Sequence, residues 1–240
     1  MTSFESQRAT EKNERLTIAI DGPAAAGKST LAKLLAQRLG YLHLDTGAMY
    51  RAVGWKAQKM GIDLADAERV TEIARATKIR LIPTSEGDNR VIADGEDVTT
   101  PIRAAQAGEW ASRVSALPGV RRVLVAQQRQ MGSGGGVVAE GRDMQTVVFP
   151  AAEVKIFLTA PTKERARRRF LELKSKGIEA DLEKIEAEMG KRDQRDSTRA
   201  DSPLRPAPEA ITVDTEGKGI EEVLSEVLEI VSRAKKRQAR

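Results

Sequence analysis

The chain has 240 residues, with 40 Lys and Arg against 35 Asp and Glu, and its formal net charge is +5. This length fits one sizeable α/β domain with a small insertion. Because there is no cysteine, disulfides, thiolate metal sites and thiol catalysis are excluded. The single histidine, His43, leaves little for a His-based zinc site or a Ser-His catalytic pair.

Aromatic residues make up only 3% of the chain, which argues against a surface that stacks single-stranded bases. The basic excess fits either polyanionic small ligands or nucleic acid, and we do not expect nucleic acid to be the main partner. Residues 1–14 are polar and mixed in charge, so we predict a disordered leader. No apolar run approaches membrane-spanning length, and we expect a cytoplasmic monomer with no membrane partner.

A buried strand is predicted from Leu16 to Asp21, and an amphipathic helix is predicted from Lys28 onward. Between them the spacing G-x-x-x-x-G-K-[ST] is typical of a phosphate-binding loop, whose glycines let backbone N–H groups approach an anion at a helix N-terminus. Lys28 supplies a charge for the β- and γ-phosphates, and the Ser29 hydroxyl is a magnesium ligand. We predict that ATP or GTP is bound by Gly22, Pro23, Ala24, Ala25, Ala26, Gly27, Lys28, Ser29 and Thr30.

The helix after this loop is predicted to end at Gly40, and a short strand follows from Tyr41 to Asp45, in which we expect His43 to be a packed or rim residue. A second helix starts at Thr46. From Gly61 to Pro101 the pattern changes to a short helix over 65–76 and two strands joined by a polar turn. Such a hairpin interrupts the βα alternation and therefore predicts an inserted subdomain.

Two helices are predicted between Ile102 and Met131, interrupted at Pro118, and the glycines of 132–136 form a connector. An apolar strand then ends on Glu140-Gly-Arg-Asp143, a charged group that would lie at the carboxyl edge of a parallel sheet, where ligands collect. The next strand covers 154–158.

A helix that opens at Pro161 carries Arg165, Arg167, Arg168 and Arg169, and a second charged helix begins at Asp181. This hairpin is either a solvated face with i,i+4 ion pairs or an arginine-rich flap that closes over a triphosphate, and we favour the flap. A last strand covers 210–214. The last helix is predicted from Ile220 to Val231, followed by a frayed basic tail over 233–240.

Strands at Leu16, Leu42, Val137, Val154 and Ile211 with intervening helices predict a doubly wound, five-stranded parallel sheet of the α/β class. A GTPase would need a base-reading Asn-Lys-x-Asp, which is absent, and Asp214-Thr-Glu-Gly217 lies too late in the chain to serve as its D-x-x-G. A motor ATPase would need more chain. We therefore predict a phosphotransferase for a small acceptor.

Several motifs together resemble the bacterial cytidylate kinases, and the resemblance runs from about Leu16 to Val231. They are Ile18-Ala-Ile-Asp-Gly-Pro-Ala-Ala-Ala-Gly-Lys-Ser-Thr30, Leu44-Asp-Thr-Gly-Ala-Met-Tyr-Arg51, Gly141-Arg-Asp-Met-Gln-Thr-Val-Val-Phe-Pro150 and Arg192-Asp-Gln-Arg-Asp-Ser-Thr-Arg199. The resemblance implies transfer of the γ-phosphate of ATP to CMP or dCMP, with Mg²⁺. It also implies a core P-loop domain (15–60, 101–164 and 204–232), an inserted nucleotide-monophosphate-binding subdomain (61–100) and a helical lid (165–203).

The resemblance also implies individual roles. By this resemblance, the acceptor phosphate is bound by Thr46, Arg51 and Arg142. The cytosine is contacted by Ser112, Arg121 and Asp143. The sugar, base and transfer region under the lid is contacted by Arg192, Asp196 and Arg199. Catalysis is assigned to Lys28, Arg142, Arg192 and Arg199, because phosphoryl transfer depends on positioning and charge rather than on a covalent or histidine base.

The chain departs from this family at two positions. Glu140 stands where many members have Asp, so its carboxylate reaches one methylene further. Gln145 stands where many members have Gly, and Gly can hold backbone angles that other residues avoid. Two rival hypotheses stay open: a phosphate-loop kinase for UMP or a metabolite hydroxyl, and a nucleotide-dependent RNA-binding module that uses the basic tail and lid.

Overall fold

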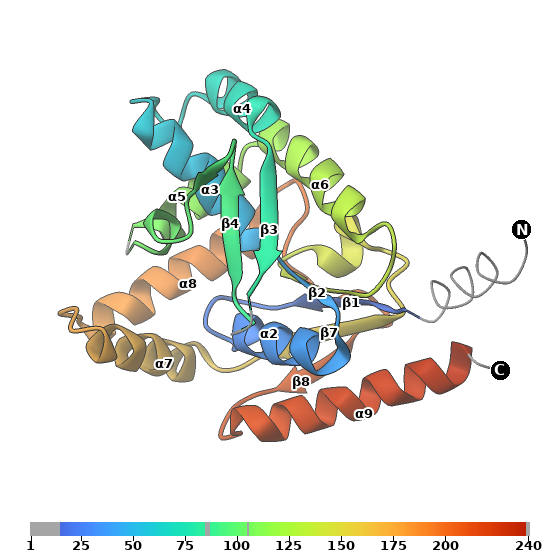
Figure 1. Ribbon diagram of the computed structural model, residues 1–240. Helices are drawn as coiled ribbons and strands as arrows, with labels where there is room; N and C mark the ends of the chain where they lie inside the picture. Colours follow the sequence, from blue (N-terminus) through green and yellow to red (C-terminus); the bar gives the residue numbers. More distant parts are fainter. Residues whose placement is uncertain (1–14, 85–86, 105, 239–240) are drawn as a thin grey trace, which may run out of the picture.

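Five parallel strands form the central sheet, in the order β2-β6-β1-β7-β8 (Figure 1). The structure is a computed structural model that describes residues 15–84, 87–104 and 106–238, so the leader predicted for 1–14 lies outside it. All five predicted strands are confirmed: β1 (Thr17–Asp21), β2 (Leu42–Asp45), β6 (Val137–Gly141), β7 (Val154–Thr159) and β8 (Ile211–Asp214). Because the strands are parallel, their carboxyl ends share one edge of the sheet, and the loop after the central strand β1 lies in the middle of that edge.

Helices cover both faces of this sheet, as the near-continuous apolar strands require. Ile18 and Ile20 of β1 pack with α2 (Lys28–Leu39) and α9 (Ile220–Gln238) on one face. Ala19 between them faces the opposite cluster, which contains α3 (Thr46–Lys59) and α6 (Pro118–Gly132). The doubly wound α/β fold is therefore confirmed.

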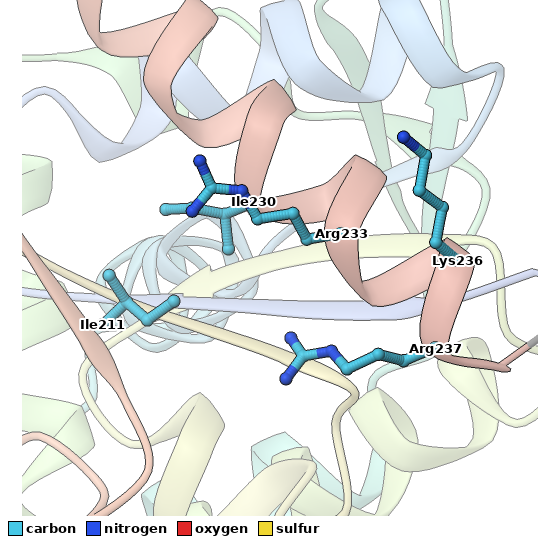
Figure 2. Close-up of a pocket in the computed structure, with 5 residues that line it drawn as sticks. All are labelled: Ile211, Ile230, Arg233, Lys236 and Arg237. Carbon is cyan, nitrogen blue, oxygen red and sulfur yellow. The ribbon is translucent and has the colours of Figure 1, made fainter.

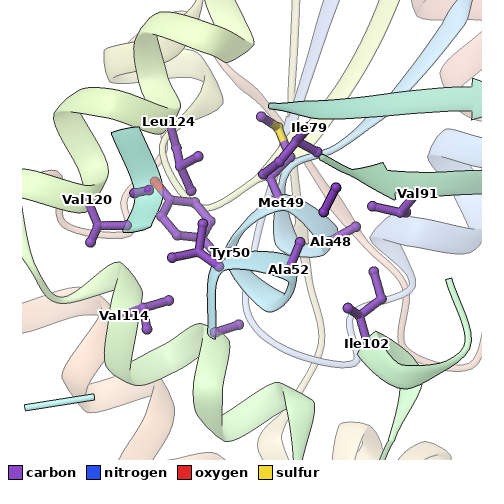
Figure 3. Packing of buried hydrophobic residues seen from close by; sticks show 14 of the residues in the cluster. Ala48, Met49, Tyr50, Ala52, Ile79, Val91, Ile102, Val114, Val120 and Leu124 are labelled. Carbon is purple, nitrogen blue, oxygen red and sulfur yellow. The ribbon is translucent and has the colours of Figure 1, made fainter. Parts of the chain in front are cut away.

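The larger of the two cores lies between α3, α5 (Ala107–Ser115) and α6 (Figure 3). Helices α3 and α5 approach closely at Gly54, where an added Cβ would lie 2.7 Å from the Cβ of Trp110. Pro118 is the first residue of α6, a position at which its missing N–H costs nothing. The predicted interruption is thus the start of a new helix.

A second, antiparallel sheet is separate from the central one and contacts it at β2 (Figure 1). It contains β3 (Ile79–Pro83), β4 (Asn89–Ala93) and β5 (Glu96–Asp97), and it follows α4 (Ala67–Ala76). The predicted hairpin is confirmed, but it has a third short strand that the sequence analysis missed. Helix α4 begins two residues later than predicted because Asp66 caps it, with its carboxylate accepting from the Arg69 N–H.

The charged hairpin consists of α7 (Thr162–Ser175) and α8 (Leu182–Thr198), which pack against each other (Figure 1). The frayed tail predicted from residue 233 is wrong as far as Gln238, because α9 continues to that residue and Ala234 is still buried. Within the described ranges no helix is long and apolar enough to cross a membrane.

Candidate functional site

The phosphate-loop sequence forms a tight turn from β1 into α2. Gly22 has a φ of 151°, and a Cβ there would lie 2.2 Å from the carbonyl oxygen of Leu158, so only glycine fits. Gly27 is the N-cap of α2 with a φ of 90°. The first turn of α2 has no side-chain cap and no acidic residue, which leaves its N–H groups and positive dipole end for an anion.

The Lys28 side chain is buried within this turn, where its ammonium donates to the carbonyl oxygen of Pro23 at 2.6 Å. Burial, and then the neighbouring Arg142, lower the pKa of Lys28 well below its usual value. Arg165 of α7, which the sequence analysis did not assign to the site, donates to the carbonyl oxygen of Ala24 at 3.1 Å and to the Asp193 carboxylate at 2.6 Å. It therefore ties both helices of the hairpin to the loop.

Four cations from separate elements meet at this edge of the sheet. In addition to burial, Arg142 and Arg192 lie close enough to Lys28 to lower its pKa. In the same way, Arg142 and Arg51 lie close enough to Arg192 to lower the pKa of that guanidinium. Burial, and then Arg142, lower the pKa of Arg192 to about 10. Like charges this close are unfavourable unless anions lie among them, so the cluster is suited to phosphate groups.

Two carboxylates partly offset this charge. Arg142 Nε donates to Asp196 of α8 at 2.9 Å, and Arg51 Nη2 donates to Asp45 at 2.8 Å. The Nε atoms of Arg51 and Arg192 are buried without a hydrogen-bond partner, which leaves donors for a ligand. Thr46, predicted beside them, is buried with its hydroxyl donating to the carbonyl oxygen of Glu140 at 2.6 Å.

A second cluster holds the residues predicted around the acceptor base. Arg121 forms a buried ion pair with Asp143, and its guanidinium lies 5.9 Å from the ring centre of Tyr50. Arg199 lies near this pair. Burial, and then Arg121, lower the pKa of Arg199, while Asp143 opposes this change. Burial raises the pKa of the Tyr50 hydroxyl to about 12, so this residue stays neutral.

Ser112 of α5 is buried, and its hydroxyl accepts from Arg195 of α8 at 2.6 Å. Thus α8 reaches both clusters, through Asp196 to Arg142 and through Arg195 to Ser112. Arg195 was not among the predicted residues, although it stands inside the motif that ends at Arg199.

The sole histidine and the unusual Glu140 are in contact. Glu140 Oε2 accepts from the Ser29 hydroxyl at 2.7 Å, and Glu140 Oε1 lies 3.1 Å from His43 Nε2. Although burial opposes protonation of His43, the bond to Glu140 raises the pKa of its ring overall. His43 is therefore a packed residue, as predicted, and it also contacts a residue of the candidate site.

A charged side chain that the sequence analysis did not assign fixes the segment after β6. Asp21, at the end of β1, accepts from the backbone N–H groups of Met144 and Gln145, both at 2.9 Å. These residues belong to a π-helix, Met144–Val148, that no sequence pattern indicated. Burial raises the pKa of Asp21 to about 7. Its two bonds hold the turn that presents Arg142 and Asp143.

Gln145 keeps a backbone conformation open to any residue, since its φ is not positive. Its buried amide donates to the carbonyl oxygen of Ile156 at 2.6 Å and accepts from the Ala207 N–H at 3.1 Å. The side chain therefore links β7 to the segment after α8, where a glycine could form neither bond.

The arginines of α7 do not all face the loop. Arg167 pairs with Glu164 and Arg169 pairs with Glu172 on the solvent side, which matches the alternative prediction of a solvated face with ion pairs. Arg168 also pairs with Glu164, but its two Nη atoms donate to the hydroxyl and the carbonyl oxygen of Thr215, which lies within the D-x-x-G match at 214–217.

Arg168 and Thr215 border a hollow beside Gly27 and Thr30 of the loop. A larger groove lies at the opposite edge of the sheet, between the start of β8 and the end of α9 (Figure 2), lined by Ile211, Ile230, Arg233, Lys236 and Arg237. It contains none of the predicted site residues, so the candidate site is the charged edge and the hollow beside it.

Comparisons with known proteins point to one family. The family model described as cytidylate kinase matches residues 18–233. A cytidylate kinase of Symbiobacterium thermophilum is 47% identical over 91% of this chain and 97% of its own length, and one of Caldicellulosiruptor bescii is 49% identical over 94% and 99%. A bifunctional pantoate ligase/cytidylate kinase of Synechococcus is 48% identical over 92% of this chain and 41% of its own length.

Among solved structures, a shikimate kinase from Acinetobacter baumannii covers 94% of this chain and 97% of its own at 14% identity, with a TM-score of 0.45. This structural similarity is too weak to support a family assignment. The family model and the relatives decide it, since both span nearly all of the described residues. The chain belongs to the cytidylate kinase family.

Proposed function

We propose that this protein transfers the γ-phosphoryl group of ATP to CMP or dCMP, giving ADP and CDP or dCDP. The observation that carries the proposal is the convergence of Lys28, Arg51, Arg142 and Arg192 at the mouth of the phosphate loop. A single triphosphate on the loop needs fewer cations than this, whereas a donor and an acceptor phosphate together would use all four.

The second cluster supports a pyrimidine nucleotide as acceptor. A buried carboxylate at Asp143, the Arg121 guanidinium and the Ser112 hydroxyl offer both acceptors and donors to the edge of an amino-pyrimidine. The proposal assigns the acceptor phosphate to Arg51 and Arg142, and the ribose and lid contacts to Asp196 and Arg199. Arg192 and Lys28 would stabilise charge on the transferring group, because phosphoryl transfer depends on positioning and electrostatics.

The donor-side residues fit a magnesium ion. Ser29 and Glu140 offer oxygen ligands of the kind that Mg²⁺ prefers. Across the described residues no group of three or more His, Cys, Asp or Glu could hold a metal, which suits an ion that keeps waters and binds mainly through nucleotide phosphates. When bound, the ion would neutralise phosphate charge. Ser29 would hold it, with Glu140 beside it.

The hollow next to the loop supports a place for the base of ATP. Thr215 and Arg168 line it together with Leu158 and Val223, which belong to the core on the α2 and α9 face of the sheet, whereas the acceptor cluster lies with α3, α5 and α6 on the other face. This placement would set the donor and acceptor bases on opposite sides of the transferred phosphoryl group.

A coupled assay of ADP release with MgATP tests the proposal against CMP, dCMP, UMP, AMP and shikimate. We expect the highest kcat/KM with CMP or dCMP and little turnover without an acceptor. Equal use of UMP, or a preference for AMP or shikimate, would make the acceptor assignment wrong. RNA binding at physiological salt without acceptor-dependent turnover would support the RNA-binding alternative.

A further inference from the structure

The carboxylate of Glu140 is held from two sides. One oxygen accepts from Ser29 of the phosphate loop at 2.7 Å and the other lies 3.1 Å from Nε2 of His43. Glu140 and His43 are only 4% and 8% exposed. The proposed function uses Ser29 and Glu140 but gives His43 no role.

The sheet explains why these side chains meet. His43 of β2 is paired with Val138 of β6, and Glu140 stands two residues further along β6. Residues two apart on a strand point to the same face, here the face that packs on α2, where Ser29 lies. His43 and Glu140 are therefore diagonal neighbours, a spacing that long side chains can bridge.

The backbone of His43 is also held from outside the central sheet. Asn89 of β4 donates to the carbonyl oxygen of His43 at 2.7 Å, in a buried contact. The adjacent Asp88 lies 3.0 Å from Lys33 of α2. The inserted sheet thus contacts both the strand that carries the imidazole and the helix that carries Ser29.

We propose that His43 is a positioning residue that holds the Glu140 carboxylate beside Ser29 and so sets the affinity of the donor-side metal. This inference rests on the proposed function of Ser29. A glutamate has one more rotatable bond than an aspartate, so its carboxylate needs a second contact to stay in one place. The imidazole Nε2–H supplies that contact, as partners behind metal ligands commonly do.

The test uses Mn²⁺ as the metal and ADP as a nucleotide that cannot transfer a γ-phosphoryl group. Electron paramagnetic resonance of free Mn²⁺ gives the affinity of the protein–ADP complex for the ion without any turnover. We expect His43→Phe to weaken Mn²⁺ binding by about 10-fold, the lower end of the usual loss for such partners. CMP affinity, measured by calorimetry, should change less than twofold.

Two further variants separate positioning from packing. His43→Gln keeps an N–H donor and should restore most of the affinity. In a Glu140→Asp background the shorter carboxylate no longer needs the imidazole, so adding His43→Phe should change Mn²⁺ affinity less than twofold. The matched control is Thr77→Val, which removes a buried hydrogen bond from Thr77 to the carbonyl oxygen of Ile73 far from the loop. It should lower the Tm without altering Mn²⁺ affinity.

Wild-type Mn²⁺ affinity in His43→Phe would overturn the proposal. So would an equal loss in the wild-type and Glu140→Asp backgrounds, because His43 would then act independently of the carboxylate. If His43→Phe does not fold, His43→Leu, which also lacks a donor, replaces it: a loss of Mn²⁺ affinity confined to the wild-type background supports positioning, and an equal loss in both backgrounds, or none in either, contradicts it. Absence of CMP kinase activity alongside these shifts would refute only the proposed function.

Discussion

The two halves of the candidate site are built in different ways. The phosphate-binding part of the donor half is one run of chain, residues 22–30, whose backbone N–H groups and Lys28 all come from a single strand-to-helix turn. The acceptor half is assembled from β2, α3, α5, α6, the end of β6 and α8. A local site of backbone groups tolerates variation elsewhere in the chain, whereas a dispersed site depends on the whole fold to bring its side chains together.

This contrast predicts that donor and acceptor variants separate in their kinetics. The largest effect should come from Lys28→Ala, which removes the buried amine that we propose stabilises the phosphates. We expect kcat to fall about 10²–10³-fold, the usual loss on removing one preorganised group, with a small change in KM for CMP. Steady-state kinetics measures both constants. Lys33→Ala, one turn further on and partly exposed, is the control and should keep wild-type kcat. A Lys28→Ala enzyme with unchanged kcat would refute the donor assignment.

A smaller effect on a different constant is expected from Arg142→Ala. This change removes the contact that we propose for the acceptor phosphate and leaves Asp196 buried without its partner. We expect KM for CMP to rise by about 10–100-fold, which corresponds to about 1.4–2.7 kcal/mol, and kcat to fall as well. KM for ATP should change far less. Arg90→Ala, which breaks an exposed pair with Asp97, is the matched arginine control. Unchanged constants for CMP would contradict the acceptor assignment.

The smallest effect concerns Asp21, which directly precedes the phosphate loop. Its carboxylate accepts hydrogen bonds from the turn that follows Arg142 and Asp143. Because the folded state raises its pKa from 3.8 to about 7, its contribution to stability is complete below pH 3.8 and is lost as the pH rises through 7. The loss should be about 1 kcal/mol between pH 6 and pH 8.

Asparagine at this position does not titrate. Urea unfolding at several pH values should therefore show the free energy of unfolding of the wild type, minus that of Asp21→Asn, falling over this range. A difference that does not vary with pH would show that Asp21 is ionised throughout.

The same contrast explains what could be predicted from the sequence. The loop, the five strands and the inserted hairpin follow from spacing and periodicity over short stretches. The acceptor residues came from the family resemblance, because nothing local says that Arg121 and Asp143 will pair. Asp21 supporting Gln145, and Arg165 reaching Ala24, are contacts across more than a hundred residues, and only the folded sheet creates them.

Glu140 and Gln145 show a further limit on what a single sequence can predict. Read singly, each is a departure from the family, but the structure gives each a partner: His43 for one, Ile156 and Ala207 for the other. A single sequence can show that a residue is unusual, but it does not reveal which contact goes with the change.

The central claim is that the two halves act on one phosphoryl group. The most direct measurement mixes the protein with MgATP labelled at the γ-phosphorus and unlabelled CMP, then separates the products by ion-exchange chromatography. We predict that the label leaves ATP and appears in CDP in equal amounts. Label released as inorganic phosphate at the same rate with and without CMP would contradict the account, because the donor half would then work without the acceptor half.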